Sequence, residues 1–351
     1  MFVRTVHAKH RLKALKRLWH SFPNNSVFFL LALTLLIFQT GKAQIITTGL
    51  NETKAFVVNF NPAFIKAKNI KSITKHITNK PDNHVIVDKG LIEYYEFNKA
   101  GLLVSTYTTE IKSSTSTEVM SYTLGQHGRR IPYYKTEYSY LYDTTFVFYT
   151  YDSLNRMTIK RTSIIGREVF KSHYFEYDPF GNFKKETVIR EVNSAENIRD
   201  FKPGMQTVLS VESFTYETLI PGQIRKKFLN DEGRVYKEGI IHSDEKGRVT
   251  EESFDFSVTW IKERNNYQYN DKGLLSEKKM TSNDGFLSQE SYEYGFDATG
   301  LLQDLQIFKS GVKINNISFV YSKENNQIES EVNRDDKNAS IGIVKYEYGF
   351  Y

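Results

Sequence analysis

The 351-residue sequence contains no cysteine, and this absence excludes several kinds of protein. Without thiols there is no disulfide framework and no cysteine to carry a lipid, so stability has to come from packing alone. A zinc site would need histidine and carboxylate ligands. The five histidines after residue 43 do not have the spacing that places two ligands on one helix face: His76, His84, His127, His173 and His242. We therefore expect no metal and no cofactor.

Sequence motifs of common catalytic sites are also missing. The chain has no glycine-rich phosphate loop, no Gly-x-Ser-x-Gly elbow and no dinucleotide fingerprint. Asp and Glu are abundant, so counting alone does not exclude the carboxylate pair of a glycosidase. Most of these carboxylates fall at turn positions or at outward strand positions, which favours structural roles. We expect no catalytic residues and no enzyme activity.

Basic residues give the chain a formal charge of +6, but they are unevenly placed. Of the 47 Lys and Arg residues, seven lie within residues 1–43, where there is no Asp or Glu. The rest of the chain therefore has 40 basic and 41 acidic residues. Residues 44–351 are therefore close to neutral, and non-specific phosphate binding has little electrostatic drive. We expect no nucleic-acid partner.

Residues 1–43 have the features of a secretory signal peptide. The apolar run Val27–Phe38 is short for a membrane-spanning helix, follows a basic region and precedes the small residues Gly41 and Ala43. Cleavage after Ala43 would place the protein in the periplasm, on the outer surface or outside the cell. One alternative is an uncleaved anchor, which would then be the chain's only contact with a membrane. The other is a buried core segment.

A short pattern recurs through the rest of the chain. It consists of an aromatic residue, any residue, a second aromatic, Asp or Asn, two variable residues, Gly or Asn, any residue and a large apolar residue. The clearer copies begin at Tyr95, Tyr149, Phe175, Tyr267 and Tyr294; weaker ones are Asn230–Val235, Asp244–Val249 and Phe319–Asn325. Successive Gly or Asn positions of the pattern, with Gly128 counted among them, are separated by 25 to 27 residues or by 52. The one exception is a step of 14 residues between Gly233 and Gly247.

The pattern predicts an all-β fold of serial hairpins, each about 26 residues long. Apolar side chains two residues apart, such as Tyr292, Tyr294 and Phe296, indicate a strand with one buried face. Asp or Asn starts a turn, and Gly or Asn tolerates positive φ. The predicted turn residues are Gly101, Asp178, Gly181, Gly233, Gly247, Gly273, Asp297 and Gly300. Hairpins in series would form an extended or wound antiparallel sheet; a β-sandwich with coincidental spacing is the alternative.

Residues 70–351 carry a resemblance to a known family on these motifs. Tyr-Asp-x-x-Gly followed by an apolar position resembles the YD repeat of the Rhs family, and Asp178–Gly181 (Asp-Pro-Phe-Gly) is similar to a form common there. The resemblance implies arrays that wind into a β-sheet shell around a toxin, or that act in surface contact and carbohydrate binding. This chain has few repeats and ends in the β-like Tyr346–Tyr351, which departs from a toxin-carrying shell.

Two segments lack the repeat. Residues 44–69 are expected to form an N-terminal cap, with a short helix Pro62–Lys68 that begins after Asn61 and covers the open first edge of the array. Residues 191–204 are expected to form an exposed insertion with a short helix near Ser194–Asp200.

The aromatic stripe of the repeat has two interpretations. At a spacing of two residues it is most simply the core of the sheet. Tyrosine in place of Phe or Leu also suits a ligand platform with one ring edge in water, formed by Tyr149, Tyr151, Tyr177, Tyr267, Tyr269, Tyr292 and Tyr294. The sequence thus predicts an exported, non-catalytic repeat protein with a structural or binding role at the cell envelope. Its partner would be carbohydrate or another envelope protein; the alternative is a carbohydrate-active enzyme or a toxin-associated component of an Rhs-like system.

Overall fold

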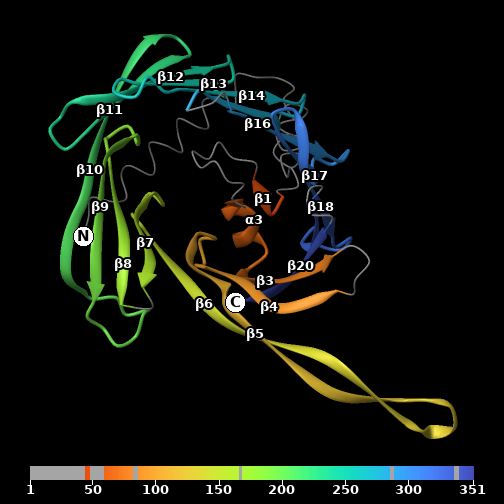
Figure 1. Ribbon diagram of the computed structural model, residues 1–351. Coiled ribbons are helices and arrows are strands. Elements are labelled where there is room, and N and C mark those ends of the chain that lie inside the picture. The colour runs from red at the N-terminus through yellow and green to blue at the C-terminus, as the bar shows by residue number, and fades with distance from the viewer. Residues whose placement is uncertain (1–43, 48–58, 82–85, 166–167, 285–287, 336–339) are drawn as a thin grey trace, which may run out of the picture. The chain divides into compact units, whose positions relative to one another are not determined.

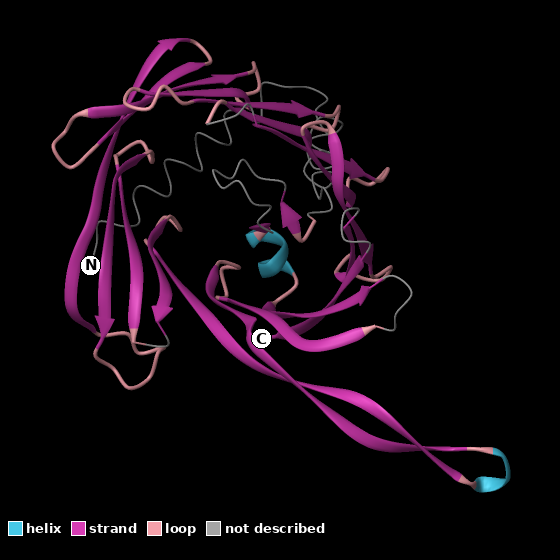
Figure 2. Ribbon diagram, in the orientation of Figure 1, coloured by secondary structure: helices cyan, strands magenta, loops and turns pink. Residues whose placement is uncertain are grey.

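The computed structural model describes residues 44–47, 59–81, 86–165, 168–284, 288–335 and 340–351. The signal-peptide prediction for residues 1–43 lies outside these ranges. The described part of the chain has no helix that is long and apolar enough to cross a membrane. Almost all of it is strand (Figure 2), so the prediction of an all-β antiparallel fold is confirmed.

The elements follow one another in chain order. Two short strands and one helix come first, and a 3-10 helix (Gln126–Gly128) lies between β5 and β6. The elements are β1 (Ile46–Thr47), β2 (Asn59–Phe60), α3 (Pro62–Ala67), β3 (Ile70–Pro81), β4 (Val87–Phe97), β5 (Leu103–Leu124), β6 (Arg130–Tyr151), β7 (Met157–Ile165), β8 (Val169–Tyr177), β9 (Phe183–Asn193), β10 (Pro203–Ile220), β11 (Gln223–Leu229), β12 (Val235–Ser243), β13 (Val249–Phe256), β14 (Lys262–Tyr269), β15 (Leu275–Ser282), β16 (Ser288–Phe296), β17 (Leu302–Lys309), β18 (Val312–Tyr321), β19 (Ile328–Asp335) and β20 (Ser340–Phe350).

Strands β3 to β20 form one closed antiparallel barrel (Figure 1). Each strand pairs with the strands before and after it in the chain, and β20 pairs with β3 from Ser340 opposite Pro81 to Phe350 opposite Ile70. The sheet is therefore neither open nor merely extended. The expectation that residues 44–69 cover an open first edge is wrong, because closure leaves no such edge.

The segment before the barrel packs inside it instead. The helix expected after Asn61 is present as α3, with the Asn61 side chain accepting a hydrogen bond from the backbone N–H of Ala63. Figure 1 shows β1 and α3 inside the ring of strands. Phe60 contacts the rings of Tyr95 and Phe97 edge-on, at centroid distances of 4.8 and 5.3 Å. This segment therefore supplies part of the barrel's core.

Seven described turns share one hydrogen-bonding pattern. In each, the Asp or Asn side chain accepts from the backbone N–H groups two and four residues later, and the backbone closes a tight loop, as at Asp178. The residue three positions on has positive φ, for example +92° at Gly181 and +62° at Asn155. The turns begin at Asn98, Asp152, Asp178, Asn230, Asp244, Asn270 and Asp297. A related loop starts at Ser322 but is one residue longer, so its positive-φ residue is Asn326 and not the expected Asn325.

The 14-residue step in the repeat has a structural cause. The turns at Gly233 and Gly247 lie before and after the single strand β12, so they occupy opposite ends of the barrel. By the same alternation, the other five turns and the Ser322 loop share the end that carries Gly247. We call that end the tyrosine rim and the other end the opposite rim.

Residues 194–202, expected to contain a helix, form an irregular loop instead. The Asn193 side chain accepts hydrogen bonds from the backbone N–H groups of Ala195 and Lys202, which closes the loop without a helical turn. Phe201 then packs edge-on against the buried Phe170, at a centroid distance of 5.3 Å. The segment is thus a packed loop, and Glu191, at its start, is fully buried.

Strands β5 and β6 extend well beyond the barrel as a two-stranded arm (Figure 1). Only Leu103–Thr108 of β5 pairs with β4, and only Val147–Tyr151 of β6 pairs with β7; beyond these residues the two strands pair with each other alone, out to Leu124 and Arg130. Gly128, which the sequence places in register with the turns, lies at the tip of this arm.

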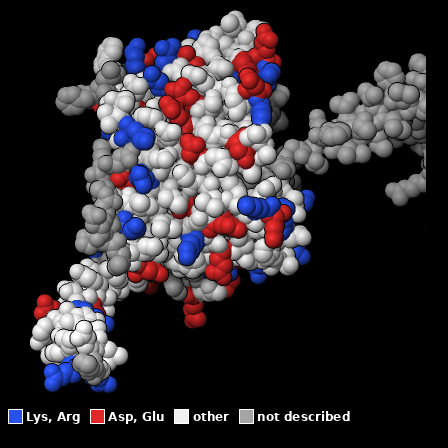
Figure 3. Space-filling model, turned by 90° about the vertical axis from the view of Figure 1, so that its right-hand side faces the viewer, with Lys and Arg blue, Asp and Glu red and all other residues white. Residues whose placement is uncertain are grey.

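The outer face of strand β14 is polar. On β14, Lys262, Arg264, Asn266 and Gln268 alternate with the residues that face inward. Figure 3 shows Lys, Arg, Asp and Glu spread over the face that includes β17, β18 and β20. A barrel embedded in lipid carries an apolar band at these positions. Strand β14 has no such apolar band.

Candidate ligand site on the inner wall

The inner wall is divided into an aromatic half and a polar half. Near the tyrosine rim, inward residues of the barrel form one buried cluster with Ile45, Ile46, Phe64 and Ile65 of the N-terminal segment. Toward the opposite rim the inward positions on β15 and β16 become charged or polar, for example Ser282 and Glu290, although Phe228 on β11 and Phe254 on β13 also face inward there. This division arises because the inward residues of a single strand change from aromatic near the tyrosine rim to carboxylate or polar near the opposite rim, as on β16.

Five tyrosines that directly precede a turn, or occupy the equivalent place on β20, link neighbouring hairpins. Each hydroxyl donates a hydrogen bond to the backbone carbonyl of the apolar residue that follows an earlier turn, at 2.7 or 2.8 Å. The donor and acceptor pairs are Tyr151–Leu103, Tyr177–Met157, Tyr269–Val249, Tyr321–Leu302 and Tyr348–Ile328. This column of hydroxyls therefore stabilises the wall.

Replacing Tyr269 with Phe should lower the free energy of unfolding by about 1 kcal/mol, because the Val249 carbonyl loses its hydroxyl donor. Phe296 occupies the equivalent place before the next turn and has no hydroxyl, so Phe296→Tyr is the matched opposite change. We expect Phe296→Tyr to leave stability unchanged or to raise it. Urea unfolding followed by circular dichroism measures both; equal losses in the two variants would contradict the role of the hydroxyl.

A second set of tyrosine hydroxyls binds carboxylates on the inner wall. Tyr95 donates to Glu93 at 2.7 Å, Tyr267 to Glu252 at 2.6 Å and Tyr292 to Glu290 at 3.2 Å. Burial raises the pKa of Tyr292 to about 12, and the neighbouring Glu290 charge adds to the effect. Burial likewise raises the pKa of Tyr151 to about 12. These phenols are held in their neutral form.

Alkaline pH should therefore unfold the barrel. The ordinary tyrosine pKa is 10.0, so between pH 10 and 12 the folded protein keeps protons that the unfolded chain has released. The free energy of unfolding then falls as pH rises through this range, whereas below pH 10 the contribution is complete. Absorbance at 295 nm and circular dichroism should change together above pH 10. Tyrosine ionisation centred near 10 with the fold intact would contradict this expectation.

Lys75 is a buried cation on the inner wall, with 5% of its side chain exposed. Its ammonium lies 3.4 Å from a Glu331 oxygen and 3.8 Å from a Glu93 oxygen. It also lies 5.0 Å from the ring centre of Tyr346, whose hydroxyl donates to Glu331. The cluster joins β3, β4, β19 and β20, and so bridges the strands where the barrel closes.

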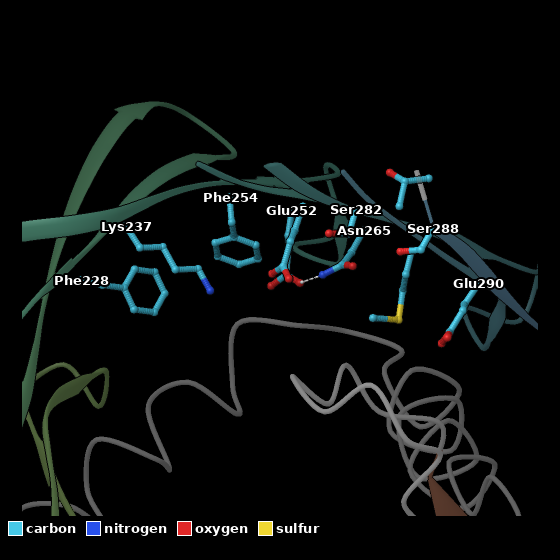
Figure 4. A pocket seen from close by; sticks show the side chains of 11 residues that line it. Phe228, Lys237, Glu252, Phe254, Asn265, Ser282, Ser288 and Glu290 are labelled. Atoms are coloured by element: carbon cyan, nitrogen blue, oxygen red, sulfur yellow. Dashed lines mark hydrogen bonds between the residues drawn. The ribbon is translucent and has the colours of Figure 1, made fainter. Parts of the chain in front are cut away.

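A cavity of about 200 Å³ lies in the polar half of the inner wall, over β11 to β16. Figure 4 shows its side chains running from Phe228, Lys237 and Phe254 at one end, through Glu252 and Asn265, to Ser288 and Glu290 at the other. The Lys237 ammonium lies 4.4 Å from the ring centre of Phe254. The remaining lining residues are Glu263, Met280, Thr281 and Ser282.

This lining offers two kinds of contact to a small ligand. The rings of Phe228 and Phe254 provide apolar faces, and the carboxylates, the Asn265 amide and the serine hydroxyls provide hydrogen-bonding groups. Such a mixture is typical of a pocket for a ligand with both apolar faces and hydroxyls. Within the described ranges, no three His, Asp or Glu side chains come together as metal ligands.

The predicted tyrosine platform does not coincide with this cavity. Tyr267, Tyr292 and Tyr294 are only 5–9% exposed and belong to the buried cluster. The hydroxyls of Tyr151, Tyr177 and Tyr269 bind backbone carbonyls, and burial raises the pKa of Tyr149. The structure thus places Tyr267, Tyr292 and Tyr294 in the core, with Tyr269 packed against them, and leaves Tyr149, Tyr151 and Tyr177 partly exposed. None of the seven predicted platform tyrosines lines the cavity.

Sequence patterns did not identify the cavity residues. Lys237, Glu252, Asn265 and Glu290 occupy inward strand positions, where a polar side chain interrupts the expected apolar alternation. The one signal present was the carboxylate two positions before the aromatic pair, as in Glu290, Tyr292 and Tyr294. By itself that spacing does not show which side chains from different strands lie close together.

Comparison with known proteins gives only distant similarity. A scan against protein-family models gives no match, and a search of curated proteins gives none either. Among solved structures, the chain is similar to a porin-like protein from Bacteroides uniformis ATCC 8492, at 8% identity and a TM-score of 0.35, with 80% of this chain and 97% of that chain covered. A porin-like protein from Bacteroides vulgatus ATCC 8482 matches at 7% identity and a TM-score of 0.31, with 80% and 98% covered.

A third match is TcdB2-TccC3-TEV, at 9% identity and a TM-score of 0.19. It covers 87% of this chain but 23% of that chain, so this chain spans under a quarter of its length. These TM-scores are too low to transfer the fold or the role of any of the three proteins.

Proposed function

We propose that this chain is an exported, non-catalytic barrel of the cell envelope that binds carbohydrate in the inner-wall cavity. Its wall is an array of YD-like hairpins about 26 residues long. The cavity between Phe228 and Glu290 carries the proposal, because it combines aromatic faces with hydrogen-bonding groups. The near-neutral charge of residues 44–351 suits an uncharged ligand better than a polyanion.

The polar outer wall supports an aqueous location for the barrel. Lys262, Arg264, Asn266 and Gln268 would face lipid if β14 spanned a bilayer, at a cost of several kcal/mol for the charged pair. The absence of cysteine from the sequence is compatible with an oxidising compartment. Export through residues 1–43 remains the prediction from the sequence.

One observation favours the enzyme alternative. Glu252, Glu263 and Glu290, from three different strands, line the same cavity. Glycoside hydrolysis uses a pair of carboxylates on either side of the scissile bond. Glu252 already accepts hydrogen bonds from Tyr267 and Asn265, and Glu290 accepts one from Tyr292. These partners favour binding over proton transfer.

A glycan array probed with the full chain tests the proposal. Ser288→Trp fills one end of the cavity, and Ser291→Trp is the matched control on the same strand with its side chain on the opposite face. We expect Ser288→Trp to weaken binding at least tenfold and Ser291→Trp to retain it. No binding to any glycan, or equal loss in both variants, would overturn the carbohydrate proposal.

The sugars that bind also separate the binding protein from the enzyme. Each is incubated with the protein, and products are analysed by mass spectrometry. Recovery of intact sugar supports a non-catalytic role. Cleavage that disappears in Glu263→Gln or Glu290→Gln would establish the enzyme alternative instead.

A further inference from the structure

The tip of the β5–β6 arm exposes large apolar side chains. We define the arm tip as residues 119–135. Six of its side chains are 45% to 76% exposed: Met120, Tyr122, Leu124, Ile131, Tyr133 and Tyr134. A concentration of this kind on a protruding element usually marks a contact with another molecule.

Both faces of the ribbon are apolar at the arm tip. Met120 lies opposite Tyr134, so these two residues share one face with Tyr122 and Leu124. Ile131 and Tyr133 lie at the alternate positions and occupy the other face. A second sheet or a second ribbon would cover one face and leave the other in water. A surrounding medium such as a lipid layer would remove the apolar side chains of both faces from water.

The net positive charge of the arm tip indicates that its partner surface is anionic. It contains Arg129, Arg130 and Lys135 and no Asp or Glu, whereas residues 44–351 as a whole are close to neutral. Lys135 is paired with Glu137 at 2.6 Å, and the two arginines lie at the end of the arm, next to Ile131. Arginine beside exposed Tyr and Leu complements an anionic surface with an apolar layer beneath it.

We propose that the arm tip binds an anionic lipid surface and inserts to the depth of the headgroups. Tyr and Arg suit that depth, because each combines an apolar body with a polar end. Deeper insertion is excluded, since a two-stranded ribbon leaves backbone N–H and C=O groups unpaired along both edges. The barrel itself stays in water, with its polar outer wall.

The topology also shows where the arm leaves the barrel. Strand β5 starts at the turn on the tyrosine rim and runs to the opposite rim, so the arm leaves the barrel there. The polar half of the inner wall, with the cavity, lies toward the same rim. Residues Ile111–Leu124 reach on the order of 40 Å beyond the barrel at the usual strand rise. The arm would therefore hold the barrel away from the membrane by up to about that distance.

The absence of cysteine allows a local test in the full chain. Leu124→Cys places a single thiol at the arm tip, and Phe180→Cys places one on a barrel turn where the side chain is 91% exposed. Each is labelled with an environment-sensitive fluorophore and mixed with vesicles of equal parts phosphatidylglycerol and phosphatidylcholine. We expect at least a twofold fluorescence increase and a blue shift at position 124, and no change at position 180. Because the readout is local, any contact through residues 1–43 does not obscure it.

Two further variants in the Leu124→Cys background test the cause. The double change Arg129→Gln and Arg130→Gln should raise the lipid concentration needed for the half-maximal fluorescence change about tenfold or more. Vesicles of pure phosphatidylcholine should give a similarly weak response with the unchanged arginines. Lys309→Gln with Lys313→Gln is the matched removal of two charges near a barrel turn and should leave the response unchanged. No response at position 124, or the same response with neutral vesicles, would overturn the proposal. A fluorescence change that needs only higher protein concentration, with dimers in sedimentation velocity, would assign the arm tip to a second copy of the chain instead.

Discussion

Gly101→Ala should destabilise the protein by about 3 kcal/mol or more, well beyond the same change at another turn. Gly101 has φ +84°, which costs any other residue strain. A methyl group there would also clash with the carbonyl oxygen of Pro62 and lie 3.0 Å from the backbone nitrogen of Lys66. These are backbone atoms of α3, so they cannot rotate away. The change should displace the helix from the barrel core.

Gly181→Ala is the matched control for Gly101→Ala. Its φ of +92° gives comparable strain, but a methyl group at Gly181 meets no atom within 4 Å. We expect a loss of about 1–2 kcal/mol from strain alone. Urea denaturation followed by circular dichroism gives both values. Equal losses at the two positions would show that α3 does not pack against the Asn98–Gly101 turn in solution.

Removing the buried cation should have an effect of similar size. Lys75→Met leaves the Glu331 carboxylate, itself in a side chain only 10% exposed, without its ammonium partner. Breaking a buried pair in this way typically costs about 3–5 kcal/mol, because the remaining charge stays desolvated. Since the cluster joins β3 to β19 and β20, the loss falls on the strands that close the barrel.

Two comparisons separate the charge effect from a packing effect at Lys75. The double variant Lys75→Met with Glu331→Leu removes both charges and should regain most of the stability. Lys135→Met removes a cation from the exposed pair with Glu137 and should leave the urea midpoint unchanged. A double variant as unstable as Lys75→Met would show that the ammonium acts through its packing and not through its charge.

The sequence predicted the local parts of this fold well, because local chemistry determines them. Asp297 and Gly300 form a turn by side-chain capping and positive φ, both of which are properties of single residues. The helix after Asn61 follows from its cap and from Pro62 in the same way. Such features do not depend on distant parts of the chain.

The features that the sequence missed depend on residues far apart. Closure pairs Phe350 with Ile70, and no local pattern indicates that partnership. The cavity combines Phe228 with Glu290, whose separate strand positions look like ordinary alternation. The arm was missed because Gly128 falls at the expected spacing, although its turn joins two strands of 22 residues. In each case tertiary packing decided among locally equivalent possibilities.

The single pairing of β20 with β3 has a consequence for how the chain folds. Every other pairing in the barrel joins consecutive strands, which can form as local hairpins with little loss of chain entropy. The last pairing brings together strands from the two ends of the array, and the backbone N–H of Tyr351 bonds the carbonyl of Asn69 across it at 3.1 Å. We therefore expect this step to be the slow one.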